Sequence, residues 1–379
     1  MENSLKFSNN KFRIMIVGDP HEKVSDESKS DQNKIEDYLS LQYEAVIREK
    51  PDLVVLMGDN ASGENEIEIE KTLLRMTRPY LDYDIPFSFI LGNHDLQGNI
   101  KDIKTMYDIY RKIPGCLMPD EKDINSYGDF NITIKSENED KDAFNLWFIY
   151  SGDAAEKKYH STYDFVKTEQ LEMYKQKAEE LKKKNGGTVH SVLFQHIPVP
   201  EVFDLLVKKT ALSFWTDATE GLGYKKNEYY ALKKDGTVEG YMGEVPCSPE
   251  YNNGEFAAWK ETGDIVAAFF GHDHMNDFIG MTDGIILGQC KTSGFRVYGD
   301  GLMQGVRILD LNESSPQNIK TRMVYYRDYF GDKCASLSGS EKILRDRTSV
   351  KLETGAKVLG CAAALSVPLI LKWILKKKK

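Results

Sequence analysis

The sequence predicts an α/β fold whose chemistry lies at the carboxyl ends of its strands. Residues 12–17, 53–57 and 86–91 are short apolar runs that end at turn-forming residues, a pattern typical of buried strands. Between these runs, residues 31–50 and 67–80 repeat apolar side chains at helical spacing. Three strand–loop–helix units in succession favour a layered α/β arrangement, and such sheets bind ligands beyond the carboxyl ends of their strands.

The rest of the chain adds strands, one charged helix and two long insertions. We expect strands at 130–134, 143–149, 189–194, 264–270, 284–287 and 305–311, and a solvated helix at 168–184. Residues 96–128 are turn-rich, and residues 201–263 hold many aromatic side chains but few clean strands. Long segments of this kind are typical of loops beside a functional site, so we expect both to be insertions over it.

The composition indicates a globular protein that does not bind nucleic acid. Of the 379 residues, 41% are hydrophobic and 29% are charged, which excludes a disordered chain. The formal net charge is −9, whereas a nucleic-acid-binding protein normally has a strongly basic surface. An anionic substrate would therefore need a local positive centre to draw it against the overall field. Five widely spaced cysteines and the lack of an apolar leader favour a reducing, cytosolic location.

The carboxyl-terminal tail has features of a membrane anchor. We divide the chain into an extension at 1–10, a folded domain at 11–330, a charged linker at 331–357, an anchor at 358–375 and a lysine tail at 376–379. The uncharged run 358–371 is shorter than the about 20 residues that a spanning helix needs. Snorkelling of Lys372 and an interfacial Trp373 would extend the span. We expect anchoring to the cytosolic face of an organelle membrane, with a docked helix or a surface amphipathic helix as alternatives.

Polar residues able to bind metals close the predicted strand ends. The last motif, Gly271-His272-Asp273-His274, places two imidazoles one residue apart, and alternate residues of an extended segment point the same way. The full series is Asp19-x-His21, Gly58-Asp59-Asn60, Gly92-Asn93-His94-Asp95, Gln195-His196 and the motif just named. Singly, a strand-end aspartate often caps a helix, and a lone histidine is often a hydrogen-bonded core residue. Together they predict a metal site, and mixed nitrogen and oxygen ligands without thiolate suit Fe, Zn or Mn.

This ordered series resembles that of the calcineurin-like metallophosphoesterases from Asp19 to His274. A closer likeness is to the intracellular purple-acid-phosphatase-related branch of fungi and plants. The residues that carry it are Tyr163-Asp164, 196–201, Asn253-Gly254, 271–277, 292–295 and 305–307. The resemblance implies a four-layer αββα sandwich, in which two mixed sheets are flanked by helices and loop insertions lie over the site.

Two positions depart from true purple acid phosphatases. Those enzymes carry a tyrosine ligand three residues after the second-motif aspartate, where this chain has Ser62. They also lack a histidine two residues after the first aspartate, where this chain has His21. The resemblance therefore implies neither a purple protein nor an obligate ferric ion.

The resemblance also implies a site for two metal ions. Carried over by position, Asp19, His21 and His274 hold one ion, Asn93, His196 and His272 hold the other, and Asp59 bridges both. Two such ions would be the positive centre that an acidic protein needs, and they would lower the pKa of the bridging water that attacks phosphorus. His94 protonates the leaving oxygen with Asp95 as its carboxylate partner, or only orients the phosphate by hydrogen bonding. Asp273 is either an acceptor for a metal-bound histidine or a solvent-facing residue.

The function implied by this resemblance is hydrolysis of phosphate monoesters through a metal-bridging hydroxide, with phosphoproteins or small phosphate esters as substrates. A phosphodiesterase acting on a nucleotide or a lipid headgroup is the alternative enzyme. A membrane-anchored scaffold that keeps the same fold is the non-enzymatic alternative. We expect Asn60, Tyr251 and Asn253 to contact substrate, although packing is the commoner role of such side chains in loops.

Overall fold

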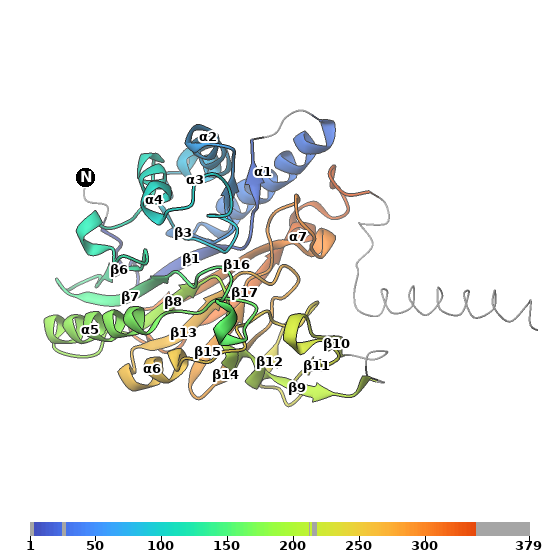
Figure 1. Ribbon diagram of the computed structural model, residues 1–379. Helices are drawn as coiled ribbons and strands as arrows, with labels where there is room; N and C mark the ends of the chain where they lie inside the picture. The colour runs from blue at the N-terminus through green and yellow to red at the C-terminus, as the bar shows by residue number, and fades with distance from the viewer. Residues whose placement is uncertain (1–3, 25–27, 212, 214–217, 339–379) are drawn as a thin grey trace, which may run out of the picture.

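Two mixed β-sheets lie face to face between two layers of helices, so the protein is a four-layer α/β sandwich (Figure 1). The structure is a computed structural model and describes residues 4–24, 28–211, 213 and 218–338. Apolar strands alternating with amphipathic helices lead to this arrangement because a largely parallel sheet has to bury both of its faces. The fold class predicted from the sequence is confirmed.

The five-stranded sheet contains the first three strands that the sequence predicts. In the order β17-β16-β1-β3-β5, its members are β17 (Lys320–Tyr325), β16 (Gly305–Asn312), β1 (Lys11–Val17), β3 (Leu53–Met57) and β5 (Phe87–Ile90). β1, β3 and β5 run parallel, whereas β16 pairs antiparallel with β1 and with β17. The carboxyl ends of the three parallel strands therefore open at one edge.

The seven-stranded sheet supplies a second set of parallel strands. In the order β12-β14-β15-β13-β8-β7-β6, its members are β12 (Val238–Glu239), β14 (Ile279–Thr282), β15 (Ile285–Gln289), β13 (Ile265–Phe270), β8 (Ser191–Gln195), β7 (Asp142–Ile149) and β6 (Phe130–Lys135). β15, β13, β8 and β7 run parallel to one another. Their carboxyl ends likewise share one edge.

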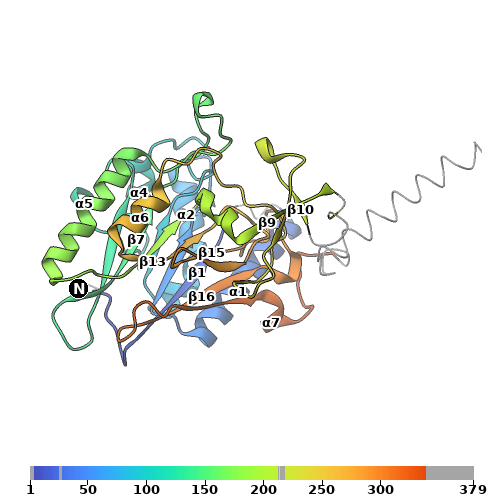
Figure 2. The ribbon, with the colours of Figure 1, turned by 90° about the horizontal axis from the view of Figure 1, so that it is seen from below.

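Helices cover the outer faces of both sheets (Figures 1 and 2). On the five-stranded side lie α1 (Lys29–Glu49), α2 (Glu66–Met76), α3 (Arg78–Asp82), α4 (Ile103–Lys112) and α7 (Tyr326–Phe330), and on the other side lie α5 (Thr168–Asn185) and α6 (Glu255–Thr262). The side chains of Ser28, Asn65 and Asp102 begin α1, α2 and α4 by accepting a backbone N–H of the first turn. Such caps satisfy donors that the helix itself leaves unpaired.

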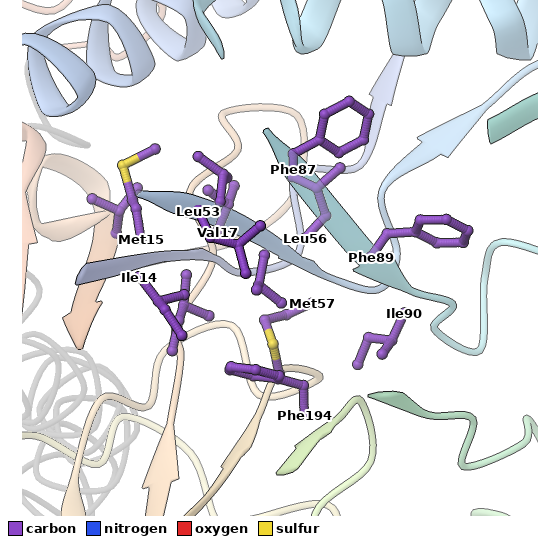
Figure 3. Packing of buried hydrophobic residues seen from close by; sticks show 14 of the residues in the cluster. Ile14, Met15, Val17, Leu53, Leu56, Met57, Phe87, Phe89, Ile90 and Phe194 are labelled. Carbon is purple, nitrogen blue, oxygen red and sulfur yellow. The ribbon is translucent and has the colours of Figure 1, made fainter. Parts of the chain in front are cut away.

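Alternation along the strands gives the seven-stranded sheet an apolar core on each face. Val192 and Phe194 of β8 belong to the core between the sheets, whereas Leu193 belongs to the core under α5 and α6. Figure 3 shows Phe194 next to Met57 of β3, where the two sheets meet. Burying one side chain of this size contributes roughly 1.5–3 kcal/mol. This packing fixes the ends of β3 and β8 relative to each other.

The predicted insertions hold more regular structure than the sequence suggests. Residues 96–128 include α4, and residues 201–263 include α6 and a small sheet of β10 (Thr219–Glu220), β11 (Tyr229–Leu232) and β9 (Leu206–Lys209). β2 (Glu22–Lys23) and β4 (Ala61–Ser62) form a further parallel pair. Short 3-10 helices occupy Glu121–Asp123, Lys157–Tyr159, Pro200–Leu205, Gly223–Lys225 and Gly301–Met303.

The folded domain reaches past both of its predicted boundaries. Leu5 and Phe7, which we assigned to an extension, are buried in the main core. Beyond α7, the N–H groups of Ala335 and Ser336 donate to the carboxylate of Asp37 in α1. The start of the predicted linker is therefore part of the packed domain.

The membrane prediction concerns a part of the chain that the structure does not describe. The predicted anchor at 358–375 and the lysine tail at 376–379 lie outside the described residues, as does most of the predicted linker. Within the described ranges, which end at residue 338, no helix is long and apolar enough to cross a bilayer.

Candidate metal centre

The parallel strands of the two sheets bring the predicted ligands to one edge of the sandwich. Asp19 and Asp59 follow the ends of β1 and β3 by two residues, and Asn93 follows the end of β5 by three. His196 comes directly after β8, and His272 follows the end of β13 by two residues. Because the sheets pack face to face, side chains from both sets of strand ends meet there.

Four of the predicted ligands have left-handed backbone conformations, which residues other than glycine rarely adopt. The angle φ is 41° at Asp19, 47° at His21, 50° at Asp59 and 70° at His272. Each such residue costs on the order of 1–3 kcal/mol and persists only where the surrounding structure dictates it. Strain of this kind gathers at functional sites, so its concentration here marks this edge as one.

Glycine makes room for two of the predicted ligands. A Cβ atom on Gly92 would lie 2.2 Å from Asp59 Oδ1, closer than non-bonded atoms approach. Gly58 has a φ of +89°, and a Cβ atom there would lie 2.6 Å from His196 Nδ1. A larger residue at either position would therefore move a predicted ligand.

Asp19, His21, Asp59 and His274 form one cluster, in which one ligand atom from each residue lies within 4.8 Å of all the others. The Nε2 atoms of His21 and His274 are 3.2 Å apart. His274 Nδ1 donates to the Tyr298 carbonyl at 3.1 Å, which leaves the Nε2 lone pair facing the cluster. Burial lowers the pKa of His21 to about 4 and the pKa of His274 to about 3, so both imidazoles are neutral at pH 7 and able to bind a metal.

His196 and Asn93 form a second group against Asp59. The buried His196 donates from Nδ1 to the Met57 carbonyl at 2.7 Å, and its Nε2 lies 3.1 Å from Asn93 Oδ1 and 3.3 Å from Asp59 Oδ2. With Nδ1 protonated, Nε2 can face two oxygens only when it carries a proton or binds a cation. Although burial favours the neutral form, the charges of Asp59 and Asp19 raise the pKa of His196 to about 10. The surroundings of His196 therefore favour a positive charge at its Nε2 atom, either a proton or a bound cation.

Asp59 connects the two groups. Its Oδ1 accepts the backbone N–H of His94 at 2.7 Å. Its Oδ2 lies 3.4 Å from His21 Nε2 and 3.3 Å from His196 Nε2, and it has no hydrogen-bond partner among the described residues. The buried Nε2 of His272 also lacks a partner in this part of the chain. Buried polar atoms rarely stay unpaired, so these two atoms fit ligands that complete their bonding with metal ions.

The two carboxylates experience different surroundings. Burial raises the pKa of Asp19 well above its usual range, against the opposing charge of His196. Burial also acts on Asp59, but there the positive charge of His196 prevails and lowers the pKa of Asp59. A cation held between both carboxylates would favour their ionised forms together.

His94 borders the site, but Asp95 is not the partner of its imidazole. The buried Asp95 carboxylate accepts the N–H groups of Gly92 at 2.7 Å and of Asn60 at 2.9 Å. This corrects the predicted pair, because Asp95 turns back into its own loop, where two buried N–H groups need an acceptor. The exposed His94 instead contacts Gln97 Oε1 through Nδ1 at 2.7 Å.

Two further predicted residues are buried in structural roles. Asn60 is fully buried, and its amide donates to the Ile90 carbonyl at 2.9 Å. It joins the ends of β3 and β5, which corrects the prediction that it contacts substrate. Asp273 is also buried, and its Oδ1 accepts the Cys247 N–H at 3.0 Å. It therefore holds a loop of the 201–263 segment and does not face solvent.

Asn253 and Tyr251 both make packing contacts. The half-buried Asn253 amide donates to the Val166 carbonyl. Tyr251 packs on Phe165 with ring centroids 4.8 Å apart, and 40% of Tyr251 stays exposed. Both contacts fit the packing role that the sequence analysis gave as the alternative. Of the two residues, only Tyr251 keeps a large accessible surface.

Sequence reasoning missed residues that hold the loops of the site. The ring of Tyr298 stacks on His274 with centroids 4.4 Å apart, in addition to the bond at its carbonyl. Lys291 is 1% exposed and pairs with Asp277 at 2.8 Å and with Asp300 at 3.1 Å. A lysine four residues after the predicted strand 284–287 was the available signal, because lysine is rarely buried unless it is paired.

The chain is similar to several known proteins. The calcineurin-like phosphoesterase family matches residues 12–276 of the chain. Probable inactive purple acid phosphatase 29 of Arabidopsis thaliana is 28% identical over 338 residues, which cover 82% of this chain and 79% of that protein. Phosphatase DCR2 of Saccharomyces cerevisiae is 28% identical over 240 residues, which cover 61% of this chain and 37% of that protein. A solved dimetal phosphatase from Danio rerio aligns with a TM-score of 0.45 at 11% identity, covering 83% of this chain and 99% of that chain.

The family match includes every strand-end motif from Asp19 to His274 and about two thirds of the chain. The chain therefore belongs to the calcineurin-like phosphoesterases.

Proposed function

We propose that the chain is a metal-dependent phosphomonoesterase whose substrates are phosphorylated proteins. The observation that carries this proposal is the position of Asp59 Oδ2, which has no hydrogen-bond partner in the described part of the chain and lies 3.4 Å from His21 Nε2 and 3.3 Å from His196 Nε2. One carboxylate oxygen between two imidazoles is what a bridging ligand of two metal ions requires. The family supports a phosphate ester as the substrate class.

Each ligand has its own task in this proposal. Asp19, His21 and His274 would hold one ion, Asn93, His196 and His272 would hold the other, and Asp59 would serve both. When bound, the two ions supply Lewis-acid charge for the phosphoryl oxygens and lower the pKa of water. The carbonyls of Met57 and Tyr298 keep Nε2 of His196 and of His274 turned to the site. His94 gives a proton to the leaving oxygen. Iron, zinc and manganese all suit the ligand set.

The alternative is a non-enzymatic role. The name of the Arabidopsis relative, which calls that protein probably inactive, is a reason to consider it. This chain retains all seven predicted ligands together with His94. A protein that only binds partners has no need of this set, so its retention favours catalysis.

Metal analysis and phosphate release test the proposal together. We expect about two metal ions per chain and faster release from p-nitrophenyl phosphate than from its bis-ester. With a phosphoserine peptide, His94→Asn should lower turnover by about 10²–10⁴-fold and leave the metal content unchanged. A metal-loaded protein that releases no phosphate from any ester would contradict the proposal, and faster cleavage of the bis-ester would identify a phosphodiesterase instead.

A further inference from the structure

Three polar side chains from two loops form a hydrogen-bonded series that ends at His94. His94 Nδ1 contacts Gln97 Oε1 at 2.7 Å, and Gln97 Nε2 donates to Asp153 Oδ1 at 3.2 Å. Gln97 lies after β5 of one sheet, whereas Asp153 lies after β7 of the other. We propose that Gln97 and Asp153 are positioning residues that orient the His94 imidazole for proton donation to an alkoxide leaving group. This inference rests on the proposed phosphomonoesterase function.

Asp153 decides which way the Gln97 amide faces. An ionised carboxylate only accepts hydrogen bonds, so the NH₂ group of the amide turns to Asp153 and its oxygen turns to His94. That amide oxygen also only accepts, so His94 Nδ1 has to carry a proton. His94 Nε2 is then the nitrogen that can exchange a proton with a substrate.

Both ends of the series are held in place. The N–H of His94 donates to Asp59 Oδ1 at 2.7 Å, which ties the backbone of His94 to the site. At the other end, the Asp153 carbonyl accepts the N–H of Asp164 at 3.0 Å. A Cβ atom on Gly152 would lie 2.5 Å from Asp164 Oδ2, so the loop that carries Asp153 is closely packed. The series therefore links two loops that are each held by other contacts.

No other described side chain takes the place of Gln97. Asp95, the neighbouring carboxylate, is occupied by backbone N–H groups of its own turn. The imidazole of His94 lies beside that of His21, with ring centroids 5.4 Å apart. His94 is thus close enough to the cluster to reach a phosphate ester bound there, and among the described residues Gln97 alone is hydrogen-bonded to its ring.

The chemistry of the step indicates which substrates need this series. The oxygen of water bonds to phosphorus, the bond from phosphorus to the leaving oxygen breaks, and its electron pair stays on that oxygen. The leaving oxygen takes the proton of His94 Nε2 and departs as an alcohol. One proton of the water stays on the phosphate product, and the other returns to His94 through solvent. An alkoxide needs this proton, whereas p-nitrophenolate is stable without it. The series therefore suits alkyl phosphates such as phosphoserine.

The dependence of rate on the leaving group tests the inference. Gln97→Ala and Asp153→Ala should lower phosphate release from a phosphoserine peptide by about 10–100-fold and change release from p-nitrophenyl phosphate by less than about 3-fold. Gln176→Ala, at a glutamine of α5 that contacts Glu180, is the matched control and should change neither rate. The double variant His94→Asn with Gln97→Ala should be no slower than His94→Asn alone, because both changes remove one function.

Two measurements separate this role from a purely structural one. Metal content and the urea midpoint of unfolding should stay at wild-type values in Gln97→Ala and Asp153→Ala. Equal losses on both substrates, additive losses in the double variant, or altered metal content would overturn the inference. A wild-type protein that releases phosphate from no ester would contradict the proposed function itself, which is a different result.

Discussion

The backbone N–H of His272 donates to both carboxylate oxygens of Asp19, at 3.0 and 3.1 Å. This contact joins residues 253 positions apart in the sequence. It links the turn after β1 in one sheet to the turn after β13 in the other, and both residues have left-handed backbones. One carboxylate thus holds the two sheets together at the edge where the predicted ligands meet.

Asp19→Asn should weaken that contact while the domain still folds. An asparagine amide has one accepting oxygen, and its NH₂ group cannot accept the N–H of His272. We expect metal affinity to fall by about 100-fold or more, measured by titration calorimetry with Zn²⁺ or Mn²⁺. Asp310→Asn is the control, because Asp310 pairs with Arg13 on a partly exposed surface. Wild-type affinity in Asp19→Asn would rule out this residue as a ligand.

Gly92→Ala should disrupt the site through Asp59 alone. The added Cβ atom would lie 2.2 Å from Oδ1 and 2.4 Å from the backbone nitrogen of Asp59, so Asp59 has to move. We expect the variant to bind metal as weakly as Asp59→Ala, although its circular dichroism spectrum stays that of a folded protein. Gly98→Ala is the control, because its nearest neighbour would be the Gly63 carbonyl at 3.6 Å. Equal metal affinities for Gly92→Ala and Gly98→Ala would refute this steric argument.

Lys291→Met should be strongly destabilising. The lysine is 1% exposed, and the substitution removes its positive charge from beside the buried carboxylates of Asp277 and Asp300. Breaking a buried pair in this way costs about 3–5 kcal/mol of unfolding free energy, measurable by urea denaturation. Lys260→Met is the control, because Lys260 and its partner Asp283 are exposed and such pairs contribute about 0–1 kcal/mol. A similar small loss in both variants would show that the Lys291 pair is not needed for stability.

The series of strand-end motifs could be predicted because the strands that carry it are buried on both faces. β3 and β13 are continuous apolar runs and β1 is one from Ile14 on, and the chain has to turn where each run stops. Parallel strands then bring those turns together without any knowledge of individual contacts. For this reason the edge of the sandwich and the residues gathered there follow from pattern alone.

Other parts of the structure depend on contacts that no local pattern reveals. The Gln97–Asp153 bond joins loops 56 residues apart, and the orientation of Asp95 depends on which buried N–H groups lack acceptors. α4 is a different case, because its buried Met106 and Tyr110 lie at helical spacing behind the capping Asp102. The signal for that helix was present but lay within a turn-rich segment.

The carboxylate of Asp142 should make the free energy of unfolding depend on pH under acidic conditions. Burial acts to raise the pKa of Asp142, but bonds from Lys135 and Lys184, both at 2.7 Å, lower it below its usual range. The stabilisation is therefore complete above the unfolded-state pKa of about 3.9 and is lost as the pH falls through the folded-state value. Asp142→Asn should be less stable than wild type at pH 6, and urea denaturation should show this difference shrinking towards pH 2. The exposed Asp140→Asn variant should show no such change, and a constant difference for Asp142→Asn would contradict the assignment.

The carboxyl-terminal tail can be tested in cells. If residues 358–375 anchor the chain, deletion of 358–379 should move the protein from the membrane fraction to the supernatant. Replacing the four lysines at 376–379 by glutamine separates anchoring from attraction to anionic lipid. A full-length protein already found in the supernatant would remove the basis for an anchor.

The left-handed turns at Asp19, His21, Asp59 and His272 also limit how the sequence can vary. Glycine would relieve the torsional strain at each of these four positions, so selection for thermal resistance alone would favour it there. Glycine cannot supply a carboxylate or an imidazole, however, and the chain has kept those groups. At each of these positions a single substitution by glycine would relax the backbone and remove a predicted ligand, so libraries screened only for heat tolerance should hold these codons fixed.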